Sequence, residues 1–490
     1  MPYGVIKFRR SSGIIPAQMT ESRRPIRAQL RTPAVRALAL VTAAALAASA
    51  GPAQMVRAQA GAMPLIRDAE IEQLLRDYSQ PILRAAGLAQ QNIRVTIIND
   101  RAFNAFVMDG QRIFINAGAL MDAKTPNEII GVLAHETGHI AGGHLARMRE
   151  QLAVAQTQSI VAMLLGMGAL VAGGARGNVN MGQAGAAVIS GPQESIRRSL
   201  LSYQRAQEEQ ADRAGVKFLT ATGQSPKGMY DTFKRLADQI LFSAVQADPY
   251  VQSHPMPAER VAALEVIAKT SPYWDKKDSP ELQLRHDMMR AKLSGFMERP
   301  DTVARRYPLS NTSLPARYAR AISTYRHFDL RSAIAQIDSL IQTQPNNPYF
   351  HELKGQALLE GGHPAEAIAP LRRAVQLAPQ PALIKVLLAK ALIATDKREV
   401  ADEAITLLRV ALAVEPDVPD GYEQLGMAYG RKGDLAQAQL AAAQAAAARG
   451  DLKTARELAA RAKTRFAIGS PGWVKADDIV TSRQTALRPN

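Results

Sequence analysis

Apolar residues recur every three to four positions in several stretches between residues 65 and 270, which is the spacing of helices that bury one face. The first such stretch is Ile66–Ala86. Pro126 and Glu128 are typical of a helix start and open the second stretch. Three further helices are therefore expected here: Asn127–Arg149, about Pro192 to Thr222, and Pro226–Ala247.

Two short runs in the same region are rich in β-branched residues. They are Ile93–Ile98 and Arg112–Asn116, and Asp109-Gly110 before the second run is a turn signal. We expect both to be strands of a small sheet among helices. Charge and proline then mark a connector over about Ser271–Ser313, with one helical piece at Leu282–Met297.

Residues from about 315 to 480 repeat one helical unit. Three Ala-Ile pairs are each followed by a closing proline, and successive closing prolines lie 34 and 37 residues apart. This pattern resembles the tetratricopeptide repeat, a helix–turn–helix unit of about 34 residues. Such units stack into a solenoid that binds peptides or proteins, and an unrelated helical bundle is the alternative. The repeated pairs and prolines are Ala333-Ile334 with Pro345, Ala367-Ile368 with Pro379, and Ala404-Ile405 with Pro416.

The N-terminal region has the pattern of an export signal. A basic segment ends at Arg36 and is followed by the uncharged run Ala37–Ala50, with small residues suited to cleavage after Ala50 or Ala60. The basic segment is long for a signal peptide, so translation could start at Met19. We expect cleavage and a periplasmic location. The alternative is an uncleaved anchor, although the run is shorter than the roughly 20 residues that span a bilayer.

Composition and charge exclude several functional classes. The chain has 490 residues and no cysteine, which excludes disulfides, thiolate metal ligands and a cysteine nucleophile. The net charge is +16, but residues 1–60 carry nine lysines and arginines against one acid, which is half of that charge in a segment that we expect to be removed. We therefore do not expect nucleic acid as a partner.

The chemistry is carried by the run His135-Glu136-Thr137-Gly138-His139. Two histidines four residues apart project from one helix face, as two ligands of one metal ion require. Glu136 is placed one step round the helix and reaches a metal-bound water without being a ligand. The preceding run Ile129–Ala134 is apolar, so this helix is expected to be buried.

A third ligand is needed, and two candidates compete. His144 is near in sequence, but it lies about 100° around the helix from the face that bears His135 and His139. We therefore expect it to be a structural residue or to contact a ligand residue without binding the metal. Glu208 is the better candidate, because Glu208 and Asp212 are also four residues apart. Asp212 would then orient an imidazole or take part in proton transfer.

These residues carry a resemblance to a known family. His135–His139 followed by Glu208 and Asp212 resembles the zinc metallopeptidases of the HtpX and Ste-type family, in which Glu-x-x-Ala-Asp supplies the third ligand. Asn104–Phe106 and Ile113–Gly118 resemble the strand segment of the family beside the active site. The resemblance implies zinc chemistry, with His135, His139 and Glu208 as the ligands.

Exported members with tetratricopeptide repeats are the most similar in layout, and they imply three further expectations. His254, in Ser253–Pro257, would cap the zinc as a fourth ligand and hold the enzyme latent. The substrates would be unfolded, misfolded or stalled outer-membrane proteins, and the repeats would recruit the outer-membrane assembly machinery. Ile160–Ala172 corresponds to membrane-spanning segments of other members, but it is too short to cross a bilayer. We expect a flap or hairpin near the active site, or one that touches a membrane-bound partner. Peripheral membrane contact and membrane insertion are the alternatives.

The expected fold is mainly α: a zincin-like metallopeptidase domain with a small β-sheet, followed by an α-solenoid of tetratricopeptide repeats. The expected function is zinc-dependent cleavage of peptide bonds, with one Zn²⁺ per subunit, Glu136 as general base and Asp212 in support. The strand near Arg112–Asn116 would bind an extended substrate by strand addition. The expected domains are an export signal (1–60), the metallopeptidase domain (61–270), a connector (271–313) and the repeats (314–490).

Two other functions are the alternatives, and the sequence does not set the substrate size that separates the second of them. One is a periplasmic chaperone or scaffold with a non-catalytic zinc site, and an intact Glu136 argues against it. The other is a processing protease for short peptides, which differs in substrate size.

Overall fold

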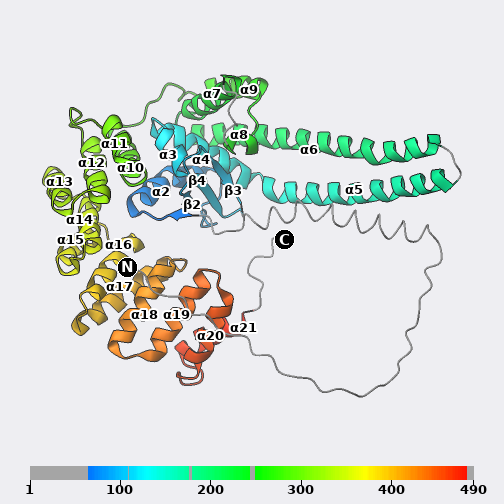
Figure 1. The fold of residues 1–490 in the computed structure, drawn as a ribbon. Helices are drawn as coiled ribbons and strands as arrows, with labels where there is room; N and C mark the ends of the chain where they lie inside the picture. Colours follow the sequence, from blue (N-terminus) through cyan, green and yellow to red (C-terminus); the bar gives the residue numbers. More distant parts are fainter. Residues whose placement is uncertain (1–63, 109, 176–178, 243–248, 483–490) are drawn as a thin grey trace, which may run out of the picture. The chain divides into compact units, whose positions relative to one another are not determined.

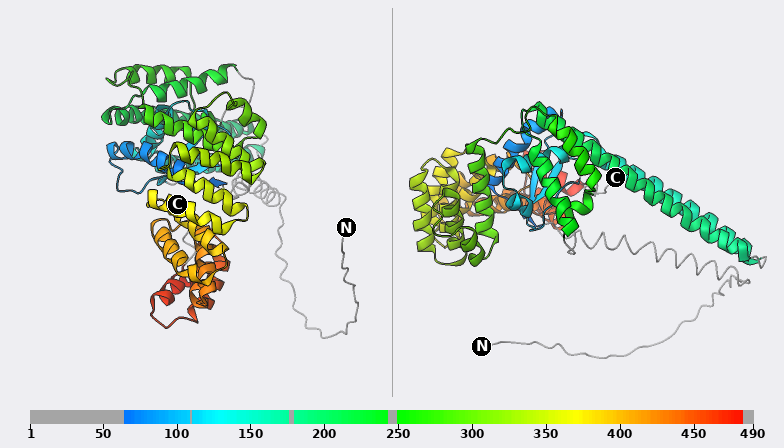
Figure 2. Two further views of the ribbon diagram at one scale, coloured as in Figure 1. Left: turned by 90° about the vertical axis from the view of Figure 1, so that its left-hand side faces the viewer. Right: turned by 90° about the horizontal axis from the view of Figure 1, so that it is seen from above.

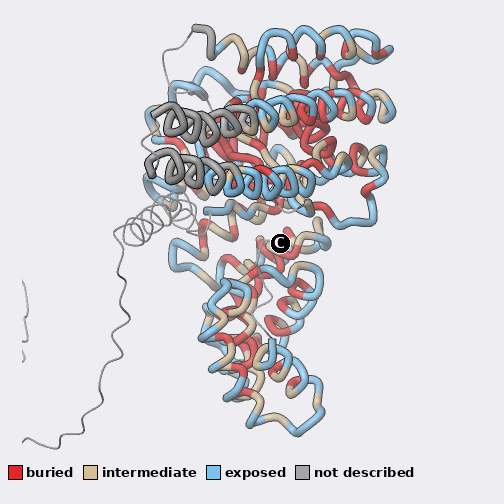
Figure 3. Tube along the Cα trace, turned by 90° about the vertical axis from the view of Figure 1, so that its right-hand side faces the viewer, coloured by how far each residue is buried: buried red, intermediate tan, exposed pale blue. Residues whose placement is uncertain are grey.

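The computed structural model describes residues 64–482 except 109, 176–178 and 243–248, and Figures 1 and 2 show its helices and strands. The expected signal peptide and both cleavage sites lie outside the described residues. The described part is mainly helical with one small sheet, as expected. Figure 3 shows buried residues along the inward sides of the helices and exposed residues on the outward sides.

Four strands form the sheet: β1 (Leu65–Ile66), β2 (Arg94–Ile98), β3 (Ala105–Val107) and β4 (Arg112–Asn116). Their order is β1-β2-β4-β3, with β2 and β4 parallel and the two outer pairs antiparallel. Two of these strands match the expected runs, with bounds within one residue. The expectation that a substrate adds to Arg112–Asn116 is wrong, because this strand is β4 and both of its sides are paired. Within the described sheet, β3 is the edge strand next to β4.

Helix α4 is the central helix of the region around the sheet. Thr125 precedes it, Pro126 occupies its first turn, and the helix ends before Gly142. It contacts α2, α6, α7 and two strands. Gly143 follows with a φ of 63°, which favours glycine and turns the chain sharply into the next helix. Helix α4 spans Pro126–Ala141, and the other short helices of this region are α2 (Ala69–Ala85), α3 (Ala117–Asp122), α7 (Lys227–Phe242), α8 (Pro249–Ser253) and α9 (Ala258–Lys269).

Two long helices, α5 (His144–Ala175) and α6 (Val179–Ala221), lie side by side as an antiparallel pair (Figure 1). The expected hairpin at Ile160–Ala172 is therefore the outer part of α5. Within the described ranges, no helix combines the length and the apolar content needed to cross a bilayer. Membrane contact by this hairpin stays a prediction.

The remaining helices pack as successive neighbours. Each of α12 to α19 contacts the next one along the chain, as stacked helix–turn–helix units do. Gly355 permits one such contact, because a Cβ there would lie 2.3 Å from Cγ of Leu371 on the partner helix. The helices are α10 (Pro280–Met297), α11 (Pro300–Arg306), α12 (Leu314–His327), α13 (Leu330–Thr343), α14 (Pro348–Glu360), α15 (Pro364–Leu377), α16 (Ala382–Ala394), the 3₁₀ turn η1 (Arg398–Val400), α17 (Ala401–Val414), α18 (Pro419–Lys432), α19 (Leu435–Ala448), α20 (Leu452–Lys463) and α21 (Pro471–Thr481).

A buried charge cluster joins α2 to α10, α12 and α14. Lys292 Nζ lies 2.7 Å from Asp68 Oδ2 and 3.1 Å from Glu70 Oε2. Glu70 also accepts a hydrogen bond from the Tyr318 hydroxyl at 2.9 Å. Burial raises the pKa of the neighbouring Glu352 to about 8. The cluster thus has more acidic than basic side chains, and its acids fix the position of its single lysine, Lys292.

Candidate metal centre

Helix α4 carries His135 and His139 one turn apart on the same face. Their Nε2 atoms lie 3.0 Å apart, and His135 is fully buried. The five residues Ile129–Leu133 before them are all buried, so apolar packing fixes this helix in the core. The pair therefore presents two nitrogens to one point that is largely shielded from water.

Helix α6 brings Glu208 to the same point. One carboxylate oxygen lies 3.4 Å from Nε2 of His135, and the other lies 3.4 Å from Nε2 of His139. Gly138 allows this approach, because a Cβ there would lie 2.8 Å from the Ala211 carbonyl oxygen of α6. The glycine inside the histidine motif thus lets the two ligand-bearing helices touch.

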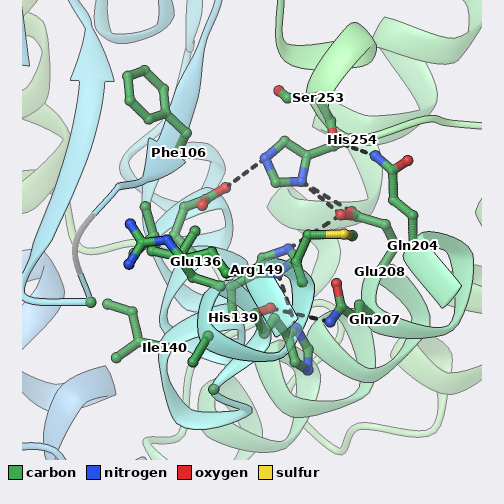
Figure 4. A pocket seen from close by; sticks show the side chains of 17 residues that line it. Phe106, Glu136, His139, Ile140, Arg149, Gln204, Gln207, Glu208, Ser253 and His254 are labelled. Atoms are coloured by element: carbon green, nitrogen blue, oxygen red, sulfur yellow. Dashed lines mark hydrogen bonds and ion pairs between the residues drawn. The ribbon is translucent and has the colours of Figure 1, made fainter. Parts of the chain in front are cut away.

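His254 is the fourth group, and it follows directly after α8. Its Nδ1 lies 3.0 Å from a Glu208 oxygen (Figure 4). The same nitrogen lies 3.3 Å from Nε2 of His135. The Tyr250 ring, one turn earlier on α8, stacks on the His254 ring at 4.6 Å. The ligand atoms of His135, His139, Glu208 and His254 all lie within 4.8 Å of one another.

Asp212 and Arg260 form a second layer around these four groups. Asp212 Oδ1 lies 2.9 Å from Nδ1 of His135, on the side of the ring away from the other ligands. Arg260, on α9, binds both oxygens of Asp212 at 2.7 and 2.8 Å. Its third nitrogen lies 2.9 Å from Glu208 and donates to the Pro255 carbonyl beside His254. One arginine thus positions two carboxylates and the segment that bears the fourth group.

The protonation states suit a cation at this point. Burial alone raises the pKa of Glu208, but the surrounding imidazoles reverse this and hold that pKa well below its usual range. Burial lowers the pKa of His139 to about 3, so this imidazole is neutral and offers a lone pair. Burial also lowers the pKa of His135, but hydrogen bonds to Asp212 and Glu208 more than offset it and raise the pKa to about 9. A bound cation would take the place of that proton.

Glu136 faces the same site from the next position on α4. Its carboxyl group is fully buried, and Oε1 lies 3.6 Å from Nε2 of His254. Burial raises the pKa of Glu136. A carboxylate with a raised pKa is suited to accepting and then releasing a proton.

A cleft of about 380 Å³ opens onto these groups. Glu136, His139, Glu208 and His254 line it, and so do Phe106 and Val107 of the edge strand β3 (Figure 4). His144 also lines the cleft, with Nδ1 3.0 Å from Nδ1 of His139. His144 thus contacts a ligand residue from behind, and it lies outside the group of four.

Zinc fits this donor set. Zinc sites in proteins use imidazole nitrogens and carboxylate oxygens in a tetrahedron with bonds of about 2.0 Å, which separates the ligands by about 3.3 Å. Separations of 3.0 to 3.4 Å between these donor atoms match that spacing, and all four donors lie within 4.8 Å of one another.

The structure brings together all six site residues expected from the sequence. Glu136 and Asp212 lie beside the four potential ligands, and His254 lies among those ligands. Sequence reasoning missed Arg260 and Tyr250. The sequence offers one signal for Arg260, which is its position at the start of a helix shortly after His254-Pro255. An isolated arginine has no spacing pattern, so this signal does not identify it as a site residue.

The chain is similar to several known proteins. The chain is 26% identical over 422 residues to a beta-barrel assembly-enhancing protease of Yersinia pestis, which covers 85% of this chain and 84% of that protein. It is similar to the metalloprotease LoiP of Escherichia coli, with 30% identity over 191 residues, 38% of this chain and 68% of that one. The crystal structure of YrrB, described as a TPR protein, matches 46% of this chain and 97% of its own at 15% identity and a TM-score of 0.26.

A family model completes the comparison. The model of peptidase family M48 matches residues 66–268, which include the four ligand candidates, Glu136, Asp212 and Arg260. The expectation of a zinc metallopeptidase of the HtpX and Ste type is confirmed. The chain belongs to peptidase family M48 and is a zinc-dependent metallopeptidase.

Proposed function

We propose that this chain is an exported endopeptidase that degrades unfolded or stalled outer-membrane proteins and assists their assembly. One observation carries the proposal: the buried Glu136 carboxyl lines the same cleft as three ligand candidates and the edge strand β3. A zinc site with a purely structural role needs no acid at that place. The name of the Yersinia pestis relative, a beta-barrel assembly-enhancing protease, supports this class of substrate.

In this proposal His135, His139 and Glu208 hold the zinc ion. When bound, zinc supplies a Lewis acid that polarises a scissile carbonyl and lowers the pKa of water. Glu136 takes the proton of the attacking water and passes it to the leaving amine. Asp212 keeps the His135 ring in one orientation through their 2.9 Å contact, and Arg260 keeps Asp212 ionised and in place.

His254 would act as a latch in the same scheme. Its Nδ1 contacts Glu208 and its Nε2 faces Glu136, so it occupies the position that an attacking water and a substrate need. The stacked Tyr250 ring and the Arg260 bond to Pro255 hold this segment against the site. Opening the latch would move these residues together.

An extended substrate would pair with β3. This strand is the edge of the described sheet beside the cleft, and Phe106 and Val107 line the cleft. Strand addition uses main-chain hydrogen bonds, so it selects chains that are unfolded rather than a particular sequence.

We propose the division expected from the sequence: a cleaved export signal in residues 1–60, the peptidase domain in 61–270, a connector in 271–313, and repeats in 314–490 that recruit assembly machinery from the periplasm. α10 agrees with a connector, because its side chains enter both the core around the sheet and the core of the first repeat.

The substrate class is tested by comparing one outer-membrane barrel protein in two states. The purified, exported chain is incubated with the unfolded barrel protein and with the same protein folded in detergent, and cleavage is followed on gels. We expect rapid loss of the unfolded form alone. Equal cleavage of both forms would contradict strand addition, and cleavage of short peptides alone would favour a processing protease.

A further inference from the structure

A second groove, of about 670 Å³, is lined by residues of α11, α12 and α13, far along the chain from the metal centre. Figure 1 shows these three helices. Its lining combines two arginines with hydroxyl groups and apolar side chains. The residues that matter for its chemistry are Arg317 and Arg320 of α12, Tyr307 and Leu309 before α12, and Phe328 after it.

The two arginines lack an acidic partner. Within the described residues, no carboxylate lies within 4.0 Å of Arg317 or Arg320. Their side chains donate hydrogen bonds to carbonyl and hydroxyl oxygens instead. Three other arginines nearby are each paired with an acid at 3.0 to 3.3 Å, namely Arg299, Arg305 and Arg306. Two half-buried guanidinium groups one turn apart therefore leave the groove with an unbalanced positive charge. Burial and the positive charge of Arg317 also lower the pKa of Arg320.

Large apolar side chains flank this charge without being covered. Leu309 is 84% exposed and Phe328 is 68% exposed, although both line the groove. Each side chain would gain from burial by a partner, at roughly 25 cal/mol for every Å² removed from water. The groove thus offers apolar contacts beside two cationic hydrogen-bond donors.

We propose that this groove binds an extended polypeptide segment in which a carboxylate side chain stands next to a large apolar side chain. The guanidinium groups would bind the carboxylate, and Leu309 and Phe328 would cover the apolar side chain. The N-terminal 60 residues of this chain fit poorly, because nine bases and one acid give them the same sign as the groove. A membrane fits poorly too, since binding to anionic lipid uses clusters of about four to eight basic residues.

The proposal goes beyond the proposed peptidase function, and its test needs no cleavage. Short fluorescein-labelled peptides carry Glu-Phe, Gln-Phe, Lys-Phe or Glu-Ser in one Gly/Ser background. Their binding to the full chain with Glu136→Gln is measured by fluorescence anisotropy. We expect saturable binding of the Glu-Phe peptide, with affinities about tenfold lower for Gln-Phe and Glu-Ser. Gln-Phe loses a charge-assisted hydrogen bond, and Glu-Ser loses the burial of an apolar side chain.

Variants locate the binding. Arg317→Gln and Arg320→Gln are expected to weaken Glu-Phe binding about tenfold, whereas Arg305→Gln, which removes an equal charge outside the groove, leaves it unchanged. The arginines also brace α12, so a Leu309→Ser/Phe328→Ser double variant provides a second test. Both side chains are exposed, and we expect this variant to lose Glu-Phe binding without a change in the urea unfolding midpoint.

Several results would overturn the proposal. Equal binding of the Glu-Phe and Lys-Phe peptides would show that the groove does not recognise a carboxylate. The same conclusion would follow if Arg305→Gln weakened Glu-Phe binding as much as Arg317→Gln and Arg320→Gln do. Binding to anionic vesicles but not to peptides would indicate a lipid surface. Self-association that the double variant abolishes, in the absence of peptide binding, would indicate a second copy of the chain as the occupant.

Discussion

Arg260 provides the sharpest test of how the metal centre is held together. Its side chain is 5% exposed, and it contacts two carboxylate side chains, those of Asp212 and Glu208, that are each 4% exposed. Replacing Arg260 by glutamine keeps a polar side chain but leaves two buried carboxylates without their cation. Breaking one partner of a buried ion pair costs about 3–5 kcal/mol, so we expect a loss of that size in the free energy of unfolding.

The control is Arg285→Gln. Arg285 also pairs with an acid, Asp77, but both side chains are about 40% exposed, so the expected loss is about 0–1 kcal/mol. Both variants are compared by urea unfolding with a chelator present, and zinc affinity is then measured by competition with a chelating dye. Because Arg260 orients the groups behind the ligands, Arg260→Gln should also lower zinc affinity about 10- to 100-fold.

Arg260→Lys separates charge from geometry. Lysine keeps the positive charge but lacks the planar fork that binds both Asp212 oxygens, so partial recovery of stability and zinc affinity is expected. The reasoning fails if Arg260→Gln loses no more stability than Arg285→Gln and binds zinc as tightly as the unaltered chain.

Three further changes test other parts of the account. Replacing His254 by alanine should raise cleavage of an unfolded protein severalfold at equal zinc content, because the latch is removed; equal or lower activity would refute the latch. Gly138→Ala places a Cβ 2.8 Å from the Ala211 carbonyl oxygen. This overlap should lower the free energy of unfolding in urea by about 1–3 kcal/mol and weaken zinc binding. An unchanged unfolding midpoint would contradict the close approach of α4 and α6. Burial raises the pKa of Glu352 to about 8 from an ordinary value of 4.5. The unfolded chain therefore releases this proton at lower pH than the folded one, so stability should fall as the pH rises from about 5 to 8. Glu352→Gln should flatten that slope, and an equal slope in both chains would exclude Glu352 as its origin.

The parts of the site that the sequence predicts are those fixed by local helix geometry. His135 and His139 are four residues apart, so any helix places them together, and Glu208 and Asp212 follow the same rule on α6. The buried run before His135 predicts that the helix lies in the core. The repeats are predictable for a similar reason, since each unit contacts its sequence neighbours.

What the sequence leaves open depends on contacts between distant segments. Arg260 meets Asp212 across 48 residues, and no periodic pattern marks it. The strand β3 has three residues, which are too few to show an alternating pattern of apolar and polar residues. The sequence therefore predicts only the longer strands, and it wrongly makes β4 the edge of the sheet. His254 is brought to the metal centre by the packing of Tyr250 and Arg260, which sequence spacing does not reveal.

The central claim is that Glu136 performs proton transfer in peptide-bond hydrolysis at a zinc ion. It is tested most directly by Glu136→Gln, an isosteric change at a residue outside the group of four ligand candidates. Degradation of an unfolded outer-membrane barrel protein is measured for the unaltered chain and the variant after zinc content has been matched by metal analysis. The account predicts full zinc content in both and a rate about 10²- to 10⁴-fold lower in the variant. Equal rates at equal zinc content would contradict it.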